Sequence, residues 1–137
     1  MPIEDDAVIR RILIDAKVIA LVGASKKPYR DSYRIGQFLL SKGYTIIPVN
    51  PNYVEIEGEK CYPDLRSIGQ PIDIIDIFRI SDAVGEIVDD AIAIHAKTVW
   101  MQLGVINEEA AQKAECEGLS VVMDRCIAIE YTRLMKV

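Results

Sequence analysis

Five short apolar runs recur along the chain, and the segments between several of them carry apolar residues at helical spacing. The apolar runs are Val18–Val22, Thr45–Val49, Ile72–Phe78, Thr98–Leu103 and Ser120–Met123. The segments with helical spacing are Tyr33–Lys42, Ser81–His95 and Asn107–Glu117. Runs that are apolar on both faces indicate strands of a buried parallel sheet, and helices between them supply the crossover connections. The pattern predicts an α/β doubly wound three-layer sandwich with a five-stranded, mainly parallel sheet.

The expected helices also carry signals at their ends. Ser81 and Asn107 are residue types that favour the N-cap position, and acidic residues follow both in the first turn. Gly43 and Gly118 stand where the second and fourth helices should end, counting a first helix near the N-terminus. These signals support the assignment of helices between the strands.

Length and composition describe one soluble domain, residues 1–137. The chain has 137 residues, of which 50% are hydrophobic and 27% are charged, without an internal repeat or linker. Its formal net charge of −5 argues against nucleic acid and anionic membrane surfaces as partners. No apolar stretch reaches the roughly 20 residues that span a bilayer, and the N-terminus does not resemble a signal peptide. We therefore expect a cytoplasmic protein, and the oligomeric state stays open, a homo-oligomer included.

The cysteine and histidine content gives no support for a metal site. Three cysteines, Cys61, Cys116 and Cys126, lack metal-ligand spacing and are an odd number. The single histidine, His95, leaves little material for a metal centre or a proton relay. We expect reduced thiols and no bound metal.

Positive charge gathers after the first expected strand. Gly23 to Ser25 are followed by Lys26, Lys27, Arg30 and Arg34. In doubly wound folds, ligands bind beyond the carboxyl ends of the strands, where a glycine and a helix N-terminus can hold a phosphate. The spacing matches neither the dinucleotide fingerprint nor the phosphate loop. A solvated turn with ordinary surface lysines fits this loop equally well.

The loops after the next two strands supply further candidates. Asn50 lies between Pro48 and Pro51, where enzymes that use NAD usually carry an acid for the ribose. The prolines form a stiff wall suited to a flat adenine ring, although a tight turn is the simpler interpretation. Phe78 and Arg79 can stack on a base and neutralise a phosphate, but a core Phe beside a surface Arg is the more frequent arrangement.

The last two loops offer an amide, a glycine and a thiol. Gln102 supplies donors and an acceptor, and Gly104 allows a ligand to approach the backbone. Cys126 stands at the expected start of the last helix beside Arg125, two features that favour a reactive thiol. No histidine near Cys126 in the sequence serves as its base, and a free cysteine is more often an inert small hydrophobe.

Together these segments resemble the family of small single-domain CoA-binding proteins. The resemblance rests on VGASKKPYRDSYRIG, GYTIIPVNPNYVEIEGEKCYPDL, DIFR, AKTVWMQLGVINEEAA and VVMDRC, in that order. It runs from about residue 12 to residue 134, and the family is related to the N-terminal CoA-binding domain of the succinyl-CoA ligase α subunit. The resemblance implies a Rossmann-like fold with coenzyme A bound across the strand ends.

The resemblance also assigns roles to particular positions. Gly23, Ala24 and Ser25 correspond to contacts with the diphosphate and the start of pantetheine. Lys26, Arg30 and Arg34 would serve the phosphates. The segment Pro48, Val49, Asn50 and Pro51 would lie beside the nucleotide, Phe78 and Arg79 over it, and Gln102 and Gly104 against CoA. CoA carries about four negative charges near neutral pH, which accounts for a basic loop on an acidic chain.

Several functions remain open at this point. The ligases carry a second domain with a phosphorylated histidine that this chain lacks, so no catalytic residue is assigned and His95 is given no catalytic role. A non-catalytic CoA or acyl-CoA binding, carrier or regulatory module is the leading interpretation. The alternatives are a thiol–disulfide or acyl-transfer enzyme that uses Cys126 with bound CoA, and an NAD-binding domain.

Overall fold

Five parallel strands form the centre of the structure, a computed structural model that describes residues 1–135. The strands are β1 (Val18–Val22), β2 (Thr45–Val49), β5 (Ile74–Ile77), β6 (Thr98–Met101) and β7 (Ser120–Val122). Their order across the sheet is β2-β1-β5-β6-β7. The chain first moves outward from β1 to β2 and then returns to the other side of β1. The carboxyl ends of β1 and β5 therefore flank the point where the winding reverses.

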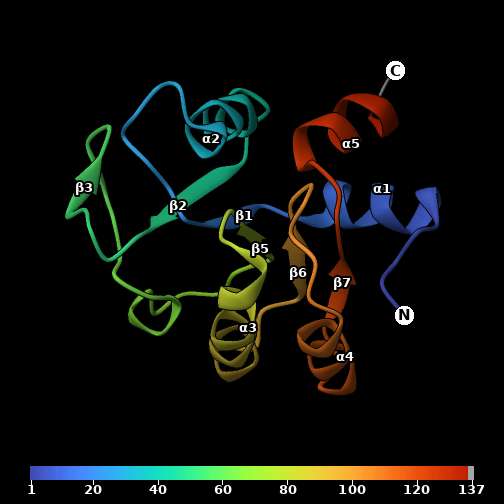
Figure 1. Ribbon diagram of the computed structural model, residues 1–137. Helices are drawn as coiled ribbons and strands as arrows, with labels where there is room; N and C mark the ends of the chain where they lie inside the picture. Colours follow the sequence, from blue (N-terminus) through green and yellow to red (C-terminus); the bar gives the residue numbers. More distant parts are fainter. Residues whose placement is uncertain (136–137) are drawn as a thin grey trace.

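Helices cover both faces of this sheet (Figure 1). The helices are α1 (Asp6–Asp15), α2 (Asp31–Ser41), α3 (Val84–Ala93), α4 (Glu108–Cys116) and α5 (Ile127–Leu134). One apolar core joins the sheet to residues of α1, α2 and α5, among them Leu13, Leu39 and Ile127. A second core joins the opposite face to α3 and α4. The predicted three-layer doubly wound fold is confirmed.

The strands form here because their side chains are buried on both faces. All four residues of β5 and all four of β6 are buried. Trp100 in β6 is fully buried, and its indole N–H donates a hydrogen bond of 2.8 Å to the Arg125 carbonyl. Apolar runs without a polar alternation are typical of such enclosed parallel strands. The same runs predicted the strands from the sequence.

Most of the predicted helix ends also agree with the structure. The Asn107 side chain accepts a hydrogen bond of 2.9 Å from the Ala110 N–H and caps α4. Gly43 and Gly118 follow the ends of α2 and α4 with φ of +96° and +88°, the left-handed conformation that favours glycine at a helix end.

The predicted N-cap at Ser81 is wrong. A 3₁₀ turn, η2 (Ser81–Ala83), precedes α3, and the Ser81 hydroxyl accepts a hydrogen bond from the Ile106 N–H at 3.0 Å. The Ser81 carbonyl also accepts from the Asn107 side chain. Ser81 therefore joins two loops at the carboxyl edge of the sheet, and this tertiary contact takes the place of local capping.

The segment between β2 and β5 contains structure that the sequence pattern did not predict. A hairpin of β3 (Glu55–Ile56) and β4 (Glu59–Lys60) turns at Glu57 and Gly58, both with positive φ. A 3₁₀ turn, η1 (Leu65–Ser67), follows. Strands of two residues show no periodicity, and Glu-Gly lacks the Asn that usually marks such a turn. The hairpin extends from the β2 side of the sheet (Figure 1).

Neighbouring segments cover both outer strands of the sheet. Tyr62 forms a bridge with Val49 of β2, and the Ile3 N–H donates to the Val121 carbonyl of β7 at 2.8 Å. Such contacts occupy backbone groups that an open edge would leave available for another chain. Within residues 1–135, no helix is long and apolar enough to cross a membrane.

Candidate ligand-binding groove

A groove with a volume of about 1150 Å³ lies at the carboxyl edge of the sheet. Its walls come from the segments that follow all five strands. The lining residues are Gly23, Ser25, Lys27, Tyr29, Arg30, Asp31, Ser32, Arg34 and Ile35 after β1; Asn50, Asn52 and Tyr53 after β2; Phe78, Arg79 and Ile80 after β5; Gln102, Leu103 and Val105 after β6; and Cys126 and Ile129 after β7. The strand ends thus converge on one cavity, at the edge that the sequence predicted.

The residues expected from the sequence fall into two groups. Eight line the groove: Gly23, Ser25, Arg30, Arg34, Asn50, Phe78, Arg79 and Gln102. The other six do not: Ala24 and Pro48 line a smaller neighbouring pocket, and Lys26, Val49, Pro51 and Gly104 line neither cavity. The Val49 side chain is buried in the core, and its carbonyl accepts a hydrogen bond of 2.9 Å from the Gly23 N–H.

Gly23 fits a close contact between the loops after β1 and β5. Its φ is +92°, and a Cβ at this position would lie 2.3 Å from the Phe78 carbonyl oxygen. A contact this short excludes any side chain, whatever the ligand. The sequence analysis selected Gly23 because a glycine lets a ligand approach the backbone. The structure shows that a glycine is needed there even without a ligand, because two walls of the groove pack together at this residue.

Asn50 connects the loops after β1 and β2. Its amide nitrogen donates to the Ala24 carbonyl at 2.8 Å, and its side-chain oxygen accepts from the Asn52 N–H at 2.9 Å. An aspartate could accept the second hydrogen bond but could not donate the first. These two hydrogen bonds explain why an asparagine, and not the acid usual in NAD enzymes, stands at this position.

The cations of the first loop differ in how they are paired. Arg34 forms an ion pair with Asp31 and donates to the Tyr29 carbonyl at 2.7 Å. Lys26 pairs with Glu55 of the hairpin at 3.6 Å. Within residues 1–135, Lys27 and Arg30 have no carboxylate partner, although both line the groove, and the same is true of Arg79 after β5. These three cations are available to a ligand.

The N-terminus of α2 opens onto the same side of the groove. Its N-cap residue, Arg30, makes no side-chain capping hydrogen bond. The first N–H groups of a helix have no partner inside the helix and carry partial positive charge, which favours an anion. Asp31 opposes this charge, but its carboxylate is already paired with Arg34. The remaining field favours a negatively charged ligand.

Gln102 and Gly104 have structural partners in the loops after β6 and β7. Gln102 is 5% exposed, and its side-chain oxygen accepts from the Ile127 N–H at 3.0 Å. The side chain thereby caps α5 while it lines the groove. The Gly104 N–H donates to Asp124 at 2.7 Å and holds the two loops together outside the groove.

Cys126 lines the groove at the N-cap of α5, as the sequence placed it. The features expected to activate its thiol have other partners. The Arg125 guanidinium donates to Glu130 at 2.6 Å, and the first N–H of α5 donates to Gln102. Cys61 is buried, which raises the pKa of its thiol, and Cys116 is exposed outside the groove.

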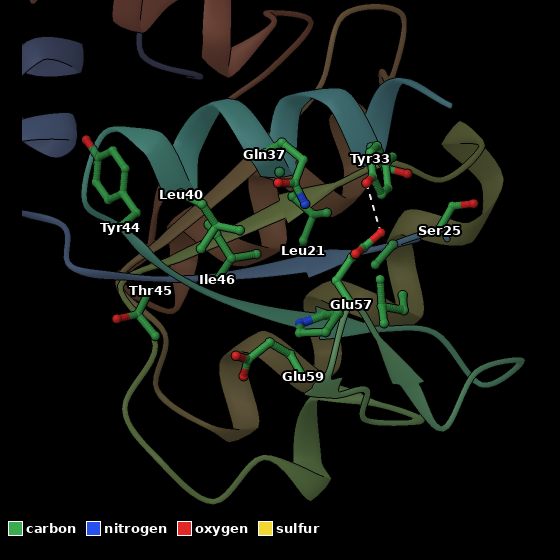
Figure 2. Close-up of a pocket in the computed structure, with 15 residues that line it drawn as sticks. Leu21, Ser25, Tyr33, Gln37, Leu40, Tyr44, Thr45, Ile46, Glu57 and Glu59 are labelled. Atoms are coloured by element: carbon green, nitrogen blue, oxygen red, sulfur yellow. Dashed lines mark hydrogen bonds between the residues drawn. The ribbon is translucent and has the colours of Figure 1, made fainter. Parts of the chain in front are cut away.

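A smaller pocket of about 480 Å³ lies between α2 and the β3–β4 hairpin (Figure 2). Leu21 and Ile46 of the sheet line it, and Tyr33 of α2 closes it with a hydrogen bond of 2.8 Å to Glu57. This bond raises the pKa of the Tyr33 phenol, because ionisation would place a second negative charge beside the carboxylate. Ser25 and Ser32 line both cavities, so the pocket adjoins the groove.

Asp76 lies within β5, fully buried and with no hydrogen-bond partner for either carboxyl oxygen among the described residues. Burial raises the pKa of this carboxyl well above its ordinary value. In the register of the sheet it stands between Leu21 and Trp100. Burial in the core therefore favours the neutral form of the Asp76 carboxyl.

Several lining residues were not expected from the sequence. Tyr29, Ile80, Leu103 and Ile129 are large apolar side chains that are each more than half exposed. The sequence marks these residues only by their position, shortly after a strand or near the start of a helix. Many ordinary surface residues share that position, so it could not identify them. Lys27 was recognised as part of the basic loop, but the resemblance pointed to Lys26 as the ligand contact.

The parallel sheet, with a cation-lined groove at its switch point, defines a Rossmann-like domain. The chain belongs to the family described as the CoA binding domain, whose model matches residues 17–132. This match confirms the family resemblance expected from the sequence.

Individual relatives support the same assignment. YneT, an uncharacterized protein of Bacillus subtilis, is 38% identical over 125 residues, which cover 91% of this chain and 93% of that protein. The ADP-forming acetate–CoA ligase I of Archaeoglobus fulgidus is 27% identical over 86% of this chain, which spans only 19% of the ligase. A solved structure of a hypothetical protein from Pyrococcus horikoshii OT3 shares 43% identity with a TM-score of 0.94, over 99% of this chain and 97% of its own.

Proposed function

We propose that this domain binds coenzyme A, or a short acyl-CoA, in the groove at the carboxyl ends of the strands. The observation that carries the proposal is a set of three cations, Lys27, Arg30 and Arg79, that line one cavity without a carboxylate partner within residues 1–135, on a chain with a net charge of −5. CoA offers a diphosphate and a ribose phosphate for these cations. Membership in the CoA-binding domain family supports the same ligand.

The residues of the groove suit such a ligand chemically. The open N-terminus of α2 and the cations would face the phosphates, and Tyr53 and Phe78 offer aromatic faces for the adenine ring. The segment from Pro48 to Pro51 would lie beside the adenine ring, because Asn50 lines the groove and its hydrogen bond to Ala24 fixes this loop. In this arrangement the nucleotide lies over β1, β2 and β5.

We further propose that the domain binds without catalysing a reaction, as a carrier or regulatory module. No lining residue pairs a nucleophile with a base within hydrogen-bond distance among the described residues. His95 follows α3 directly before β6, which places it at the opposite edge of the sheet from the groove. The chain thus supplies binding groups but no assembled acid–base pair.

Calorimetric titration with CoA and dephospho-CoA tests the proposal. Arg30→Ala and Arg79→Ala should each weaken CoA binding by roughly ten- to a hundredfold, the loss of a charge-assisted hydrogen bond of about 1.5–3 kcal/mol. Whichever arginine binds the ribose phosphate should affect CoA more than dephospho-CoA. Arg10→Ala, an exposed cation on α1, is the matched control. Absence of CoA binding to the unaltered protein at millimolar concentration contradicts the proposal.

A second candidate function is thiol–disulfide exchange at Cys126, because this thiol lines the groove. Its thiolate would attack the sulfur of a CoA disulfide, form a protein–S–S–CoA bond and release one CoA thiolate. Incubation with CoA disulfide followed by mass spectrometry should then find the adduct on Cys126. Cys116 is exposed outside the groove and serves as the internal control. Equal modification of both cysteines, or of neither, argues against this function and against acyl transfer through the same thiol.

NAD is the remaining alternative ligand, and Asn50 is the residue that argues against it. A competition experiment separates the two ligands directly. We expect that NAD does not displace CoA, because Asn50 uses both ends of its amide within the protein and offers no carboxylate to a ribose.

A further inference from the structure

The groove changes character along the carboxyl edge of the sheet. Every charged residue in its lining follows β1 or β5 in the chain: Lys27, Arg30, Asp31, Arg34 and Arg79. The segments after β6 and β7 contribute Gln102, Leu103, Val105, Cys126 and Ile129, none of which carries a formal charge at neutral pH. The groove therefore has a cationic end over β1 and β5 and an apolar end over β6 and β7.

Two large apolar side chains at the apolar end of the groove are exposed to solvent. Leu103 is 65% exposed and Ile129 is 58% exposed, and both border the same cavity. A single exposed apolar residue is ordinary, but two that line the same groove offer apolar surface to a ligand bound there. Their backbone is fixed, since Gln102 caps α5 and Asp124 holds the turn at Gly104.

We infer that the apolar end, formed by Leu103, Val105 and Ile129, binds the hydrocarbon chain of an acyl-CoA thioester. This inference rests on the proposed function, because the cationic end must hold the phosphates for the acyl chain to reach β6 and β7. Neighbouring strands lie about 4.8 Å apart, so β6 and β7 are roughly 10 Å and 14 Å from β1 across the sheet. An extended pantetheine arm spans this gap and delivers the sulfur to the apolar end.

The ligand class follows from this placement. A free thiol or an acetyl group would leave most of the apolar end exposed to water, whereas a chain of four to eight carbons would cover Leu103 and Ile129. A fully buried CH₂ is worth about fourfold in affinity. Because the groove is open on one side, we expect about twofold for each added CH₂.

The experiment is a calorimetric series with CoA, acetyl-CoA, butyryl-CoA, hexanoyl-CoA and octanoyl-CoA. Affinity should rise by about twofold per CH₂, which is roughly sixteenfold for the four CH₂ groups added from acetyl to hexanoyl. The double variant Leu103→Asn/Ile129→Thr should flatten the dependence of affinity on chain length. Val54→Asn, which changes an exposed apolar residue outside the groove, should leave that dependence unchanged.

The outcomes separate this inference from the proposed function. CoA binding with an affinity that does not change with chain length overturns the inference and leaves the proposed function standing. A chain-length dependence that persists in the double variant also overturns it, because the chain then lies elsewhere. Failure of every ligand in the series to bind contradicts the proposed function itself.

A measurement on the unaltered protein avoids dependence on the variants. Methyl resonances of Leu103 and Ile129 should shift when hexanoyl-CoA replaces CoA, and those of Val54 and Ile14 should not. Ile14 lies on α1 and is 45% exposed, away from the groove. Identical spectra of Leu103 and Ile129 with both ligands would overturn the inference.

Discussion

At the scale of single residues, the groove depends on side chains that hold its walls in place. Gly23 allows the loop after β1 to contact the Phe78 carbonyl, and Asn50 connects that loop to the one after β2. Both residues were selected from the sequence as ligand contacts. The structure gives each an additional role in assembling the site.

Gly23→Ala should destabilise the protein more than the same change at another glycine with a similar backbone. The new Cβ would lie 2.3 Å from the Phe78 oxygen, so one of the two loops must move. We expect a loss of at least ~2 kcal/mol in the free energy of unfolding, measured by urea denaturation. Gly43→Ala is the control: its φ is +96° but nothing lies within 4 Å of its Cβ, so about 1 kcal/mol is expected. Equal losses would show that only the backbone angle matters.

Asn50→Asp should lower stability and weaken ligand binding together. The aspartate cannot donate to the Ala24 carbonyl, and its charge would face that oxygen. A lost hydrogen bond with an unsatisfied partner costs roughly 1–3 kcal/mol. Thermal unfolding measures the first effect and CoA titration the second. An unchanged melting temperature would contradict the role assigned to this amide.

Asp76→Asn should change how stability depends on pH. The unfolded Asp76 ionises near pH 3.9, whereas burial raises the pKa of the folded carboxyl. Above about pH 4 the folded protein therefore keeps a proton on Asp76 that the unfolded chain releases. As pH rises, the stability of the wild type falls relative to that of the variant. The difference should grow by about 1.4 kcal/mol per pH unit until the folded carboxyl ionises. A constant difference between pH 4 and 7 in urea denaturation would contradict this account.

At the scale of elements, an ion-pair network joins α1 to α5. Arg133 pairs with Asp6 of α1 and with Glu130 of its own helix, and Glu130 also accepts from Arg125. The Glu130 side chain is only 7% exposed, and Arg133 and Arg125 lower the pKa of its carboxyl. The network fixes α5, whose first turn contributes Cys126 and Ile129 to the groove side of the molecule.

Glu130→Gln should cost about 2 kcal/mol of stability at neutral pH, because two arginines lose a charged acceptor. The folded carboxyl has the lower pKa, so its contribution is present above the unfolded pKa near 4.3 and is lost as pH falls through the folded value. The difference between the variant and wild type in urea denaturation should therefore shrink progressively as pH falls below about 4. Arg11→Gln, which breaks an exposed pair with Asp15, should have little effect at any pH.

The elements of the fold were largely predictable and the details of the site were not. Strands such as β6, buried on both faces, are recognisable as apolar runs. Asn107 begins α4 and Gly118 follows its end, both through local chemistry. The hairpin at Glu57 was not predicted and the N-cap predicted at Ser81 is wrong, because tertiary contacts and not local preference determine both segments. Sequence reasoning found the strand-end loops, but which side chain faces the groove, Lys27 or Lys26, depends on backbone direction within a loop.

At the scale of the whole molecule, the distribution of charge matters more than its sum. The chain carries −5 overall, yet three cations that have no carboxylate partner in the described part of the chain line one cavity. Raising the salt concentration from about 0.1 M to about 1 M shortens the Debye length from about 10 Å to about 3 Å. We therefore expect CoA affinity to fall by roughly tenfold, since screening should remove about 0.5 kcal/mol of long-range attraction at each of the three cations while their hydrogen bonds to phosphate persist. Titration at the two salt concentrations checks this, and a salt-independent affinity would exclude a role for these cations.

The groove draws its first lining residue from position 23 and its last from position 129. A chain emerging from the ribosome therefore has no complete groove until nearly all of it has been synthesised. On the proposed function, the ligand would therefore stabilise only the finished domain, because a chain that ends at β7 still lacks Cys126 and Ile129.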